Sequence, residues 1–303
     1  MILGTVSQTY VVYTLLSLIS ISLAKDIPAF YIFGDSGVDV GNNFYINTFA
    51  RPVFPNGIDF GNKFGTPSGR YSNGRVYVDH IAQELGLKNF PPPYLAPTTV
   101  GDILLKGTRK SFEDVDNDKK PACNLKGGRI SLETQVRYFE RTTQAIISNI
   151  GIKAAKKLLA GAIYIVAIGG NDVSTPDLNG PLDLASQDLR LDTIISMFRS
   201  QLGKLYMLGA RKIVVINSSP AGCLPFVRDV YAMPDGCVSF QNQIAQLYNS
   251  KLKGMLEELT KNLTGSQYVY ADNYAMIEDV IQNYISYGAG LIDTSAVYIE
   301  ALT

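Results

Sequence analysis

The sequence predicts an α/β fold of the doubly wound kind, in which a parallel sheet lies between two layers of helices. Four short runs are apolar on both faces, as expected of parallel strands covered by helices. Amphipathic stretches alternate with these runs, and the order strand, helix, strand predicts right-handed crossovers and three layers, α/β/α. The 303 residues are 46% hydrophobic and 18% charged, which is enough for one large core. The zero net charge gives no reason to expect nucleic acid as a partner.

Residues 1–24 are interpreted as a signal peptide, and residues 25–303 as one domain. Tyr10 to Leu23 is an apolar run without charge, and Ser22-Leu23-Ala24 offers small residues at the spacing of a cleavage site. The run is shorter than the roughly 20 residues that a membrane span needs. No later segment is long and apolar enough to span a bilayer. We therefore expect a secreted, extracellular protein without a membrane span.

The predicted strands are short and rich in β-branched and aromatic residues. They are Phe30–Phe33, Ile163–Ile168, Ile213–Ile216 and Tyr268–Tyr270.

The predicted helices show apolar residues at spacings of three and four. In the last long one, for example, Ile244, Leu247, Tyr248 and Leu252 fall on one broad face, which indicates core packing. In chain order the helices are Gly74–Leu87, Leu132–Ile150, Ala185–Leu208, Val238–Leu259 and Tyr274–Tyr287.

Two segments depart from this alternation. Lys106 to Lys126 is charged and has no periodicity, so it is interpreted as a loop, although a second strand would be expected there. Gly288 to Thr303 contains no further strand or helix of any length.

Ser36 is the candidate nucleophile. It follows the first predicted strand in the string Gly34-Asp35-Ser36, at the carboxyl end where ligands bind in open α/β sheets. Backbone N–H groups at the start of the next helix can stabilise the negative charge that develops on an attacked carbonyl. The alternative is an ordinary N-cap serine.

Asn171 is the candidate oxyanion donor. It follows the second clear strand, in Gly169-Gly170-Asn171-Asp172, and its amide can donate a hydrogen bond to an oxyanion. The alternative is a turn that Asn and Asp stabilise. Two strand ends, one with a hydroxyl and one with an amide, would meet at one crevice.

At these motifs the chain resembles the plant branch of the GDSL esterase/lipase family, within the SGNH hydrolase superfamily. The resemblance runs from about residue 28 to about residue 294. The strings that carry it are Phe33-Gly-Asp-Ser36, Val38-Asp39-Val-Gly41-Asn42-Asn43, Pro67-Ser-Gly69-Arg70-Tyr71-Ser72-Asn73-Gly74-Arg75, Gly127-Gly-Arg-Ile-Ser131-Leu, Ile168-Gly-Gly-Asn171-Asp172, Leu208-Gly-Ala-Arg211-Lys212 and Pro220-Ala-Gly222-Cys223-Leu-Pro225.

The resemblance implies a flavodoxin-like domain that hydrolyses carboxylic esters, as an esterase or lipase in the breakdown of lipids or other acyl esters. Ser36 would match the nucleophile, and its backbone N–H and the Asn171 side chain would match two of three oxyanion donors. The family's third donor is a glycine in a stretch that is replaced here from Gly107 onward, so it is not assigned. No cofactor or metal is expected, and the partner would be a small-molecule acyl ester or lipid.

The family's general base lies in an Asp-x-x-His segment near the carboxyl terminus, and none of the 303 residues matches it. We therefore expect the fold to be incomplete and the general base to be absent. The single histidine, His80, is interpreted as a partly buried helix residue rather than a base. Loss of the base costs a serine triad on the order of 10⁶ in turnover, while about 10³ to 10⁴ over water remains.

Two alternatives to ester hydrolysis stay open at this point. The chain could be a catalytically impaired or non-catalytic binding or accessory protein, with a protein partner. It could also be an acyltransferase on the same fold.

Cysteines and sequons add further candidates. Cys223 and Cys237 flank a short loop and are candidates for a disulfide in an oxidising compartment, with Cys123 left over; the alternative is three unrelated thiols. Asn262 and Asn217 each open an N-x-Ser/Thr glycosylation sequon. Asn262 follows a predicted helix and is expected to be exposed, whereas Asn217 ends an apolar strand and is expected to be less accessible.

Overall fold

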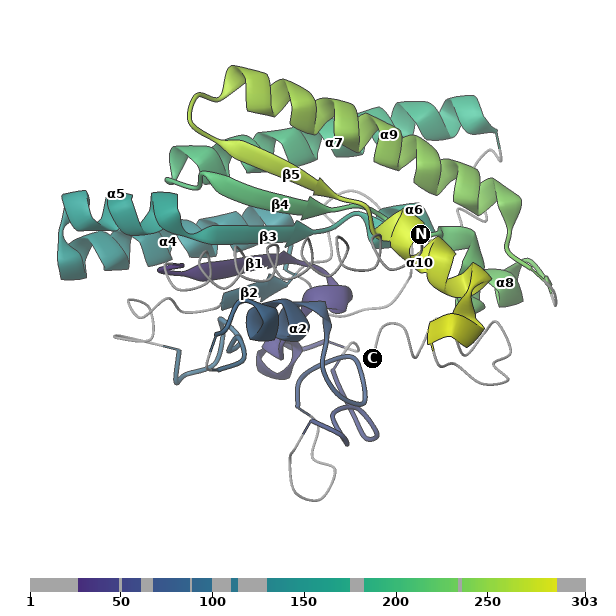
Figure 1. Ribbon diagram of the computed structural model, residues 1–303, viewed down its shortest axis with the longest axis horizontal. Coiled ribbons are helices and arrows are strands. Elements are labelled where there is room, and N and C mark those ends of the chain that lie inside the picture. The colour runs from purple at the N-terminus through teal and green to yellow at the C-terminus, as the bar shows by residue number, and fades with distance from the viewer. Residues whose placement is uncertain are drawn as a thin grey trace, which may run out of the picture.

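The computed structural model describes residues 27–48, 51–60, 68–87, 89–99, 110–113, 130–174, 183–233 and 236–287. The predicted signal peptide, Cys123 and Gly107 lie outside these residues. Within them, five parallel strands form one sheet in the order β2-β1-β3-β4-β5 (Figure 1). This is the flavodoxin-like order, in which ligands bind where the winding reverses, between β1 and β3. The predicted parallel α/β fold is thus confirmed. The strands are β1 (Phe30–Gly34), β2 (Lys110–Glu113), β3 (Ile163–Ala167), β4 (Lys212–Ile216) and β5 (Gln267–Ala271).

The β2 strand corrects the interpretation of residues 106–126 as a loop. It pairs in parallel with β1, with Tyr31 opposite Lys110 and Gly34 opposite Glu113. An edge strand needs only one neighbour, and charged residues on it discourage pairing with other chains. Four residues of mixed polarity give no periodic signal, which is why the sequence alone did not indicate a strand.

Four helices pack on one face of the sheet and form the larger core. Their apolar residues surround Tyr31, Phe139 and Tyr164, whose rings pack edge to face or tilted at centroid distances of 4.9 to 5.6 Å. In Figure 1, α7 and α9 lie along the upper strands, and α4 and α5 extend from the amino ends of the lower ones. These helices are α4 (Leu132–Ile150), α5 (Ile152–Gly161), α7 (Leu184–Met207) and α9 (Ser239–Asn262).

The opposite face carries a smaller core. There α2 (Tyr77–Glu84) packs Val78 and Ala82 against Phe30, Ile32 and other apolar residues of β1 and β3. The described helices therefore lie on both faces of the sheet, as the sequence predicts. None of them is long and apolar enough to cross a bilayer.

The observed helix ends agree with the predicted ones where a side chain caps the helix. Ser131 accepts a hydrogen bond from Thr134 N at the start of α4, as Asp183 does from Ser186 N for α7. The predicted helix over 74–87 is shorter at both ends, and α5 was not predicted; only Gly151 separates it from α4. The remaining helices are α6 (Gly170–Ser174), α8 (Pro225–Val230), α10 (Asn273–Gln282) and the 3-10 turns η1 (Ser36–Val38), η2 (Asn42–Tyr45), η3 (Ala221–Cys223) and η4 (Tyr284–Tyr287).

Candidate active site

The turn after β1 is held tightly against the end of β3. Asp35 N donates to Ala167 O at 3.1 Å. A Cβ at Gly34 would lie 2.2 Å from the same carbonyl oxygen and 2.6 Å from Val38 Cγ2. Only glycine fits this close approach, so the sequence Gly34-Asp35-Ser36 fixes where the candidate nucleophile emerges.

Gln135 on α4 completes the hydrogen bonds of this turn. Its Oε1 accepts from Gly34 N at 3.1 Å, and its Nε2 donates to Gly34 O at 3.2 Å. The side chain is fully buried. Because it satisfies both backbone groups of Gly34, Gln135 positions the residue two places before Ser36.

Ser36 begins η1 and remains partly accessible, with Asp35 as the N-cap. Asp35 Oδ1 accepts from Gly37 N at 3.2 Å. Burial raises the pKa of the Asp35 carboxyl to about 6, the Gly37 N–H opposes this shift, and the negative charge of Asp172 adds to it. A carboxyl that titrates near pH 6 thus lies beside the candidate nucleophile.

Asn171 lies just after β3, near the start of α6, as Ser36 lies just after β1. A Cβ at Gly169, whose φ is +97°, would lie 2.3 Å from the hydroxyl of Tyr248 on α9. That hydroxyl donates to Ile168 O at 2.9 Å. Burial raises the pKa of Tyr248, so its hydroxyl stays protonated as a donor. The glycine therefore lets α9 anchor the chain just before Asn171.

The ends of β4 and β5 supply further polar groups. Asn217 Nδ2 donates to Tyr270 Oη at 2.6 Å and to Asp272 Oδ1 at 2.9 Å, and its Oδ1 accepts from Tyr274 N at 2.9 Å. These bonds join the turn after β4 to the start of α10.

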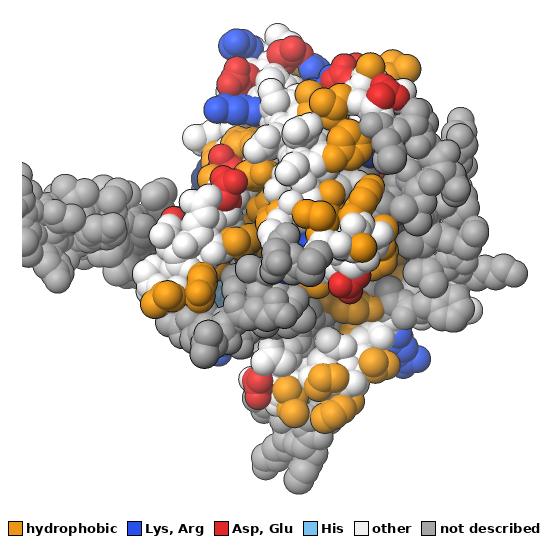
Figure 2. Space-filling model, turned by 90° about the vertical axis from the view of Figure 1, so that its right-hand side faces the viewer, with side chains coloured by type: hydrophobic (Ala, Val, Ile, Leu, Met, Phe, Trp, Pro, Cys, Tyr) orange, Lys and Arg blue, Asp and Glu red, His pale blue; other side chains and the backbone are white. Residues whose placement is uncertain are grey.

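One cavity of about 180 Å³ opens at the carboxyl edge of the sheet. Ser36 and Asn171 both line it, at the point between β1 and β3 where the winding of the sheet reverses. Figure 2 looks onto this edge, where hydrophobic side chains occupy much of the centre and charged ones gather at the upper rim. The other lining residues are Asp35, Gly37, Val38, Tyr77, Ala167, Ile168, Gly170, Ser174, Ile216, Asn217, Ser218, Ser219, Ala221, Leu224 and Asn273.

Two glycines bring the segment after Ser36 against a second loop. A Cβ at Gly69, whose φ is +89°, would lie 2.5 Å from Gly41 Cα. Asp39, which is fully buried, accepts from the backbone N–H of Gly41 and of Asn42 at 2.9 Å each. Residues 38–43 and 68–75 are therefore parts of one packed unit.

A buried ion pair fastens this unit to α2. Arg70 Nη2 lies 2.8 Å from Asp79 Oδ1, and Arg70 Nε lies 3.1 Å from Asp79 Oδ2. Arg70 also donates to Val40 O at 3.0 Å and stacks on Phe60 at 4.4 Å from the ring centroid. Such bidentate geometry satisfies both charges inside the protein.

Of the other candidate residues, His80, Cys223, Cys237 and Asn262 do not line the cavity, whereas Asn217 does. His80 is exposed on α2 rather than partly buried, and it does not line the cavity. Cys223 and Cys237 form a disulfide with a Cα–Cα distance of 4.4 Å. Asn262 is exposed at the last residue of α9, whereas Asn217 is only 5% exposed and uses its Nδ2 in hydrogen bonds.

Sequence reasoning missed several residues of the site. Asn217 and Asn273 follow predicted strands, so the rule that selected Ser36 and Asn171 could also have selected them. No signal in the sequence distinguishes Gln135 or Tyr248 from other residues of their helices, because their partners lie 101 and 80 residues away.

Comparison with known proteins gives one consistent result. Residues 30–288 match the model of the GDSL-like lipase/acylhydrolase family. The chain is 45% identical over 271 residues to GDSL esterase/lipase At4g16230 of Arabidopsis thaliana, covering 87% of this chain and 72% of the relative. Two other relatives from the same plant are 36% identical: GDSL esterase/lipase At2g23540 (86% of this chain, 70% of the relative) and GDSL esterase/lipase APG (88% and 76%).

Proposed function

Because the chain belongs to the GDSL-like lipase/acylhydrolase family, a family of carboxylic ester hydrolases, we propose that it hydrolyses small-molecule acyl esters with Ser36 as nucleophile. The observation that carries this proposal is that Ser36 and Asn171 line one cavity at the reversal point of the sheet. The resemblance of the strings around Ser36 and Asn171 to the family's motifs supports these two roles.

In the proposed reaction, Ser36 Oγ attacks the ester carbonyl and its proton passes to a base. The backbone N–H of Ser36 and the side-chain amide of Asn171 stabilise the oxyanion of the tetrahedral intermediate. The alcohol then leaves with a proton, and an acyl group remains on Ser36. Water attacks this acyl-enzyme, the carboxylic acid is released and the hydroxyl of Ser36 is restored.

We propose that His80 is not the base, because it is exposed on α2 and does not line the cavity. A serine without a base is a weak nucleophile, so this chain should hydrolyse esters slowly. Imidazole added to the solution can take the place of a histidine side chain. It should therefore accelerate hydrolysis by the chain more than hydrolysis by a variant that lacks the Ser36 hydroxyl.

The test is the hydrolysis of p-nitrophenyl acetate and butyrate, with and without imidazole, by the chain and by Ser36→Ala. Ser174→Ala is the matched control, since Ser174 lines the same cavity. We expect Ser36→Ala to lose the protein-dependent rate and the imidazole effect, and Ser174→Ala to keep both. Equal rates for the chain and Ser36→Ala, at every imidazole concentration, would contradict the assignment.

The relatives are named as esterases or lipases, which favours ester hydrolysis over a purely binding role and over acyl transfer. Labelling of Ser36 by a fluorophosphonate, located by mass spectrometry, adds support because the reaction needs an activated serine. Failure to label even with imidazole present, under conditions that label an active serine esterase, would count against catalysis.

We also propose that the protein is secreted and carries a glycan on Asn262. The apolar run before Lys25, the Cys223–Cys237 disulfide and the exposure of Asn262 support this proposal. Expression in a plant or yeast host tests it: the mature protein should begin near residue 25 and lose mass with a glycosidase. A protein that stays inside the cell and keeps residues 1–24 would contradict it.

A further inference from the structure

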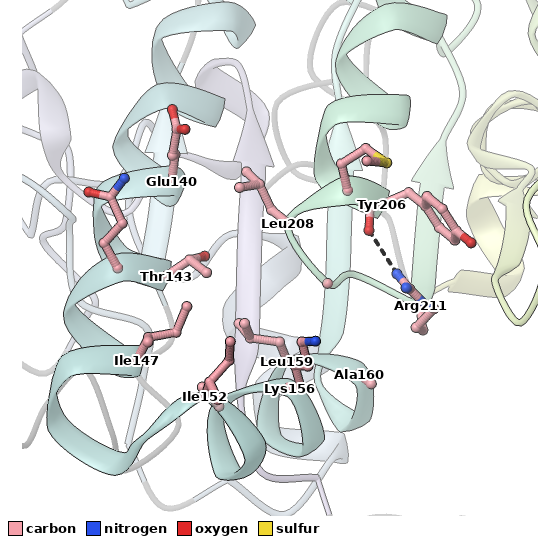
Figure 3. A pocket seen from close by; sticks show the side chains of 14 residues that line it. Glu140, Thr143, Ile147, Ile152, Lys156, Leu159, Ala160, Tyr206, Leu208 and Arg211 are labelled. Carbon is pink, nitrogen blue, oxygen red and sulfur yellow. Dashed lines mark hydrogen bonds between the residues drawn. The ribbon is translucent and has the colours of Figure 1, made fainter.

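A second, larger cavity lies at the opposite edge of the sheet from Ser36. Its volume is about 600 Å³, within the range of about 300–1,000 Å³ that is typical of small-molecule sites. It lies between α4, α5 and the turn from α7 into β4, on the amino-terminal side of the strands (Figure 3). We call it the amino-edge groove, and the proposed ester chemistry makes no use of it.

The walls of the amino-edge groove are mainly apolar. Ile147, Leu159 and Leu208 line it, each from a different helix or turn. Two apolar residues at the groove remain open to solvent: Ile152 is 60% exposed and Met207 is 81% exposed. A ligand with a methylene chain would therefore cover this apolar surface and release water from it, which favours binding.

Thr143 on α4 brings an unsatisfied hydroxyl into this groove. The residue is only 7% exposed, and its Oγ1 has no hydrogen-bond partner among the described residues. In Figure 3 the hydroxyl points from α4 toward the interior of the cavity. Buried hydroxyls are normally hydrogen-bonded, so this one is suited to donate a hydrogen bond to an oxygen atom of a ligand.

Two cations face the same space from the other sides. Lys156 on α5 forms no ion pair with the described residues. Arg211 donates from Nη1 to Tyr206 O and Ala210 O at 2.7 Å each and stacks on the Tyr206 ring, and no described carboxylate pairs with it. Glu140 is the one acidic residue among the lining residues; it lies on α4, one turn before Thr143.

We propose that the amino-edge groove binds long-chain carboxylates, that is, fatty acids. The acyl chain would lie against the apolar walls. The carboxylate would accept a hydrogen bond from Thr143 Oγ1, and the positive charges of Lys156 and Arg211 would favour it from other parts of the groove wall. Charge complementarity selects this ligand over an alcohol or a cationic amphiphile of the same length, because only the acid brings a negative charge into a groove that two cations and one carboxylate line.

The first test is calorimetric titration with dodecanoate, below its micellar concentration. Lys156→Gln removes one cation from the exposed rim, and we expect it to weaken binding about tenfold. Lys157→Gln, one residue further along α5 and outside the groove, is the matched control and should bind like the parent. Dodecan-1-ol and dodecyltrimethylammonium should bind at least about tenfold more weakly than dodecanoate to the parent protein.

Two further variants separate the groove from the catalytic crevice. Ala160→Phe fills the groove and should abolish binding. Thr143→Val should weaken binding about fivefold and leave the free protein at least as stable, since it removes an unsatisfied buried hydroxyl. No binding of dodecanoate to the parent, or unchanged affinity in Lys156→Gln and Ala160→Phe, overturns the proposal. Unchanged affinity in Thr143→Val alone would overturn the role given to the hydroxyl.

Discussion

Asp35 is the residue that makes this site sensitive to pH. It precedes the candidate nucleophile, caps η1 and has a pKa raised by burial from its usual 3.8 to about 6. The nearby charge of Asp172 contributes to the shift. Between these two pH values the folded protein holds a proton on Asp35 that the unfolded chain has already lost.

The sign of the resulting effect on stability follows from this difference in bound protons. The contribution of Asp35 is most favourable below pH 3.8 and falls as the pH rises through about 6, by up to roughly 3 kcal/mol. We expect the free energy of unfolding of the parent to fall, relative to Asp35→Asn, over this interval. Urea denaturation of both proteins between pH 4 and pH 7 measures it. A difference between the two that is constant with pH would contradict the raised pKa.

Gln135 gives a second prediction at the scale of single residues. Its replacement by alanine leaves the N–H and C=O of Gly34 without their partners in a fully buried position. We expect Gln135→Ala to lower the free energy of unfolding by about 3 kcal/mol. Asn149→Ala, at an exposed position of the same helix, should change it by less than about 0.5 kcal/mol. Chemical denaturation compares them, and equal losses would show that Gln135 does not hold the turn.

At the scale of elements, α2 and the two loops around Gly41 and Gly69 act as one unit beside the crevice. The Arg70–Asp79 pair joins the second loop to α2, and Tyr77 of α2 donates to Asn273 Oδ1 at 3.3 Å. Both Tyr77 and Asn273 line the cavity. The buried ion pair therefore positions one wall of the candidate site.

Removal of one partner of the Arg70–Asp79 ion pair should destabilise the protein more than removal of both. Arg70→Met leaves the buried Asp79 carboxylate unpaired, and we expect a loss of about 3–5 kcal/mol in the free energy of unfolding. The double variant Arg70→Met/Asp79→Leu should lose less than Arg70→Met alone, because no buried charge is left without a partner. A double-mutant cycle by thermal and urea denaturation measures the coupling. Additive losses would mean that the pair does not act as a unit.

The sequence predicted those elements whose signal is local. Apolar spacing placed α4 at Leu132–Ile150 and placed α7 and α9 to within three residues at each end. The β2 strand was missed because its only support is pairing with β1, which a charged four-residue run does not reveal.

The same distinction holds within the site. Ser36 and Asn171 follow strands directly and could be chosen from the sequence. Gln135 and Tyr248 act on these turns through hydrogen bonds that span 101 and 80 residues, and such contacts exist only once the helices have packed.

At the scale of the whole molecule, the two cavities lie at opposite edges of one parallel sheet. The cavity of the candidate active site lies at the carboxyl ends of β1, β3, β4 and β5, and the amino-edge groove lies beside the turns that lead into β3 and β4. The central strands β1 and β3, which lie between them, are packed on both faces by apolar side chains. Variants in the groove and in the crevice should therefore be independent of each other, since energetic effects of distant sites add.

The disulfide provides the last prediction, because it acts on the stability of the entire fold. Cys223 and Cys237 are 14 residues apart and close the loop between β4 and α9, next to the cavity residues Ala221 and Leu224. In the chain-entropy account, a loop of this length stabilises the folded state by about 3 kcal/mol, mainly by restricting the unfolded chain. We expect Cys223→Ser/Cys237→Ser to lose about that amount in guanidinium unfolding, and dithiothreitol to produce the same loss in the parent. Cys123→Ser is the control and should match the parent with and without reductant. Equal stability of the double variant and the oxidised parent would contradict the prediction.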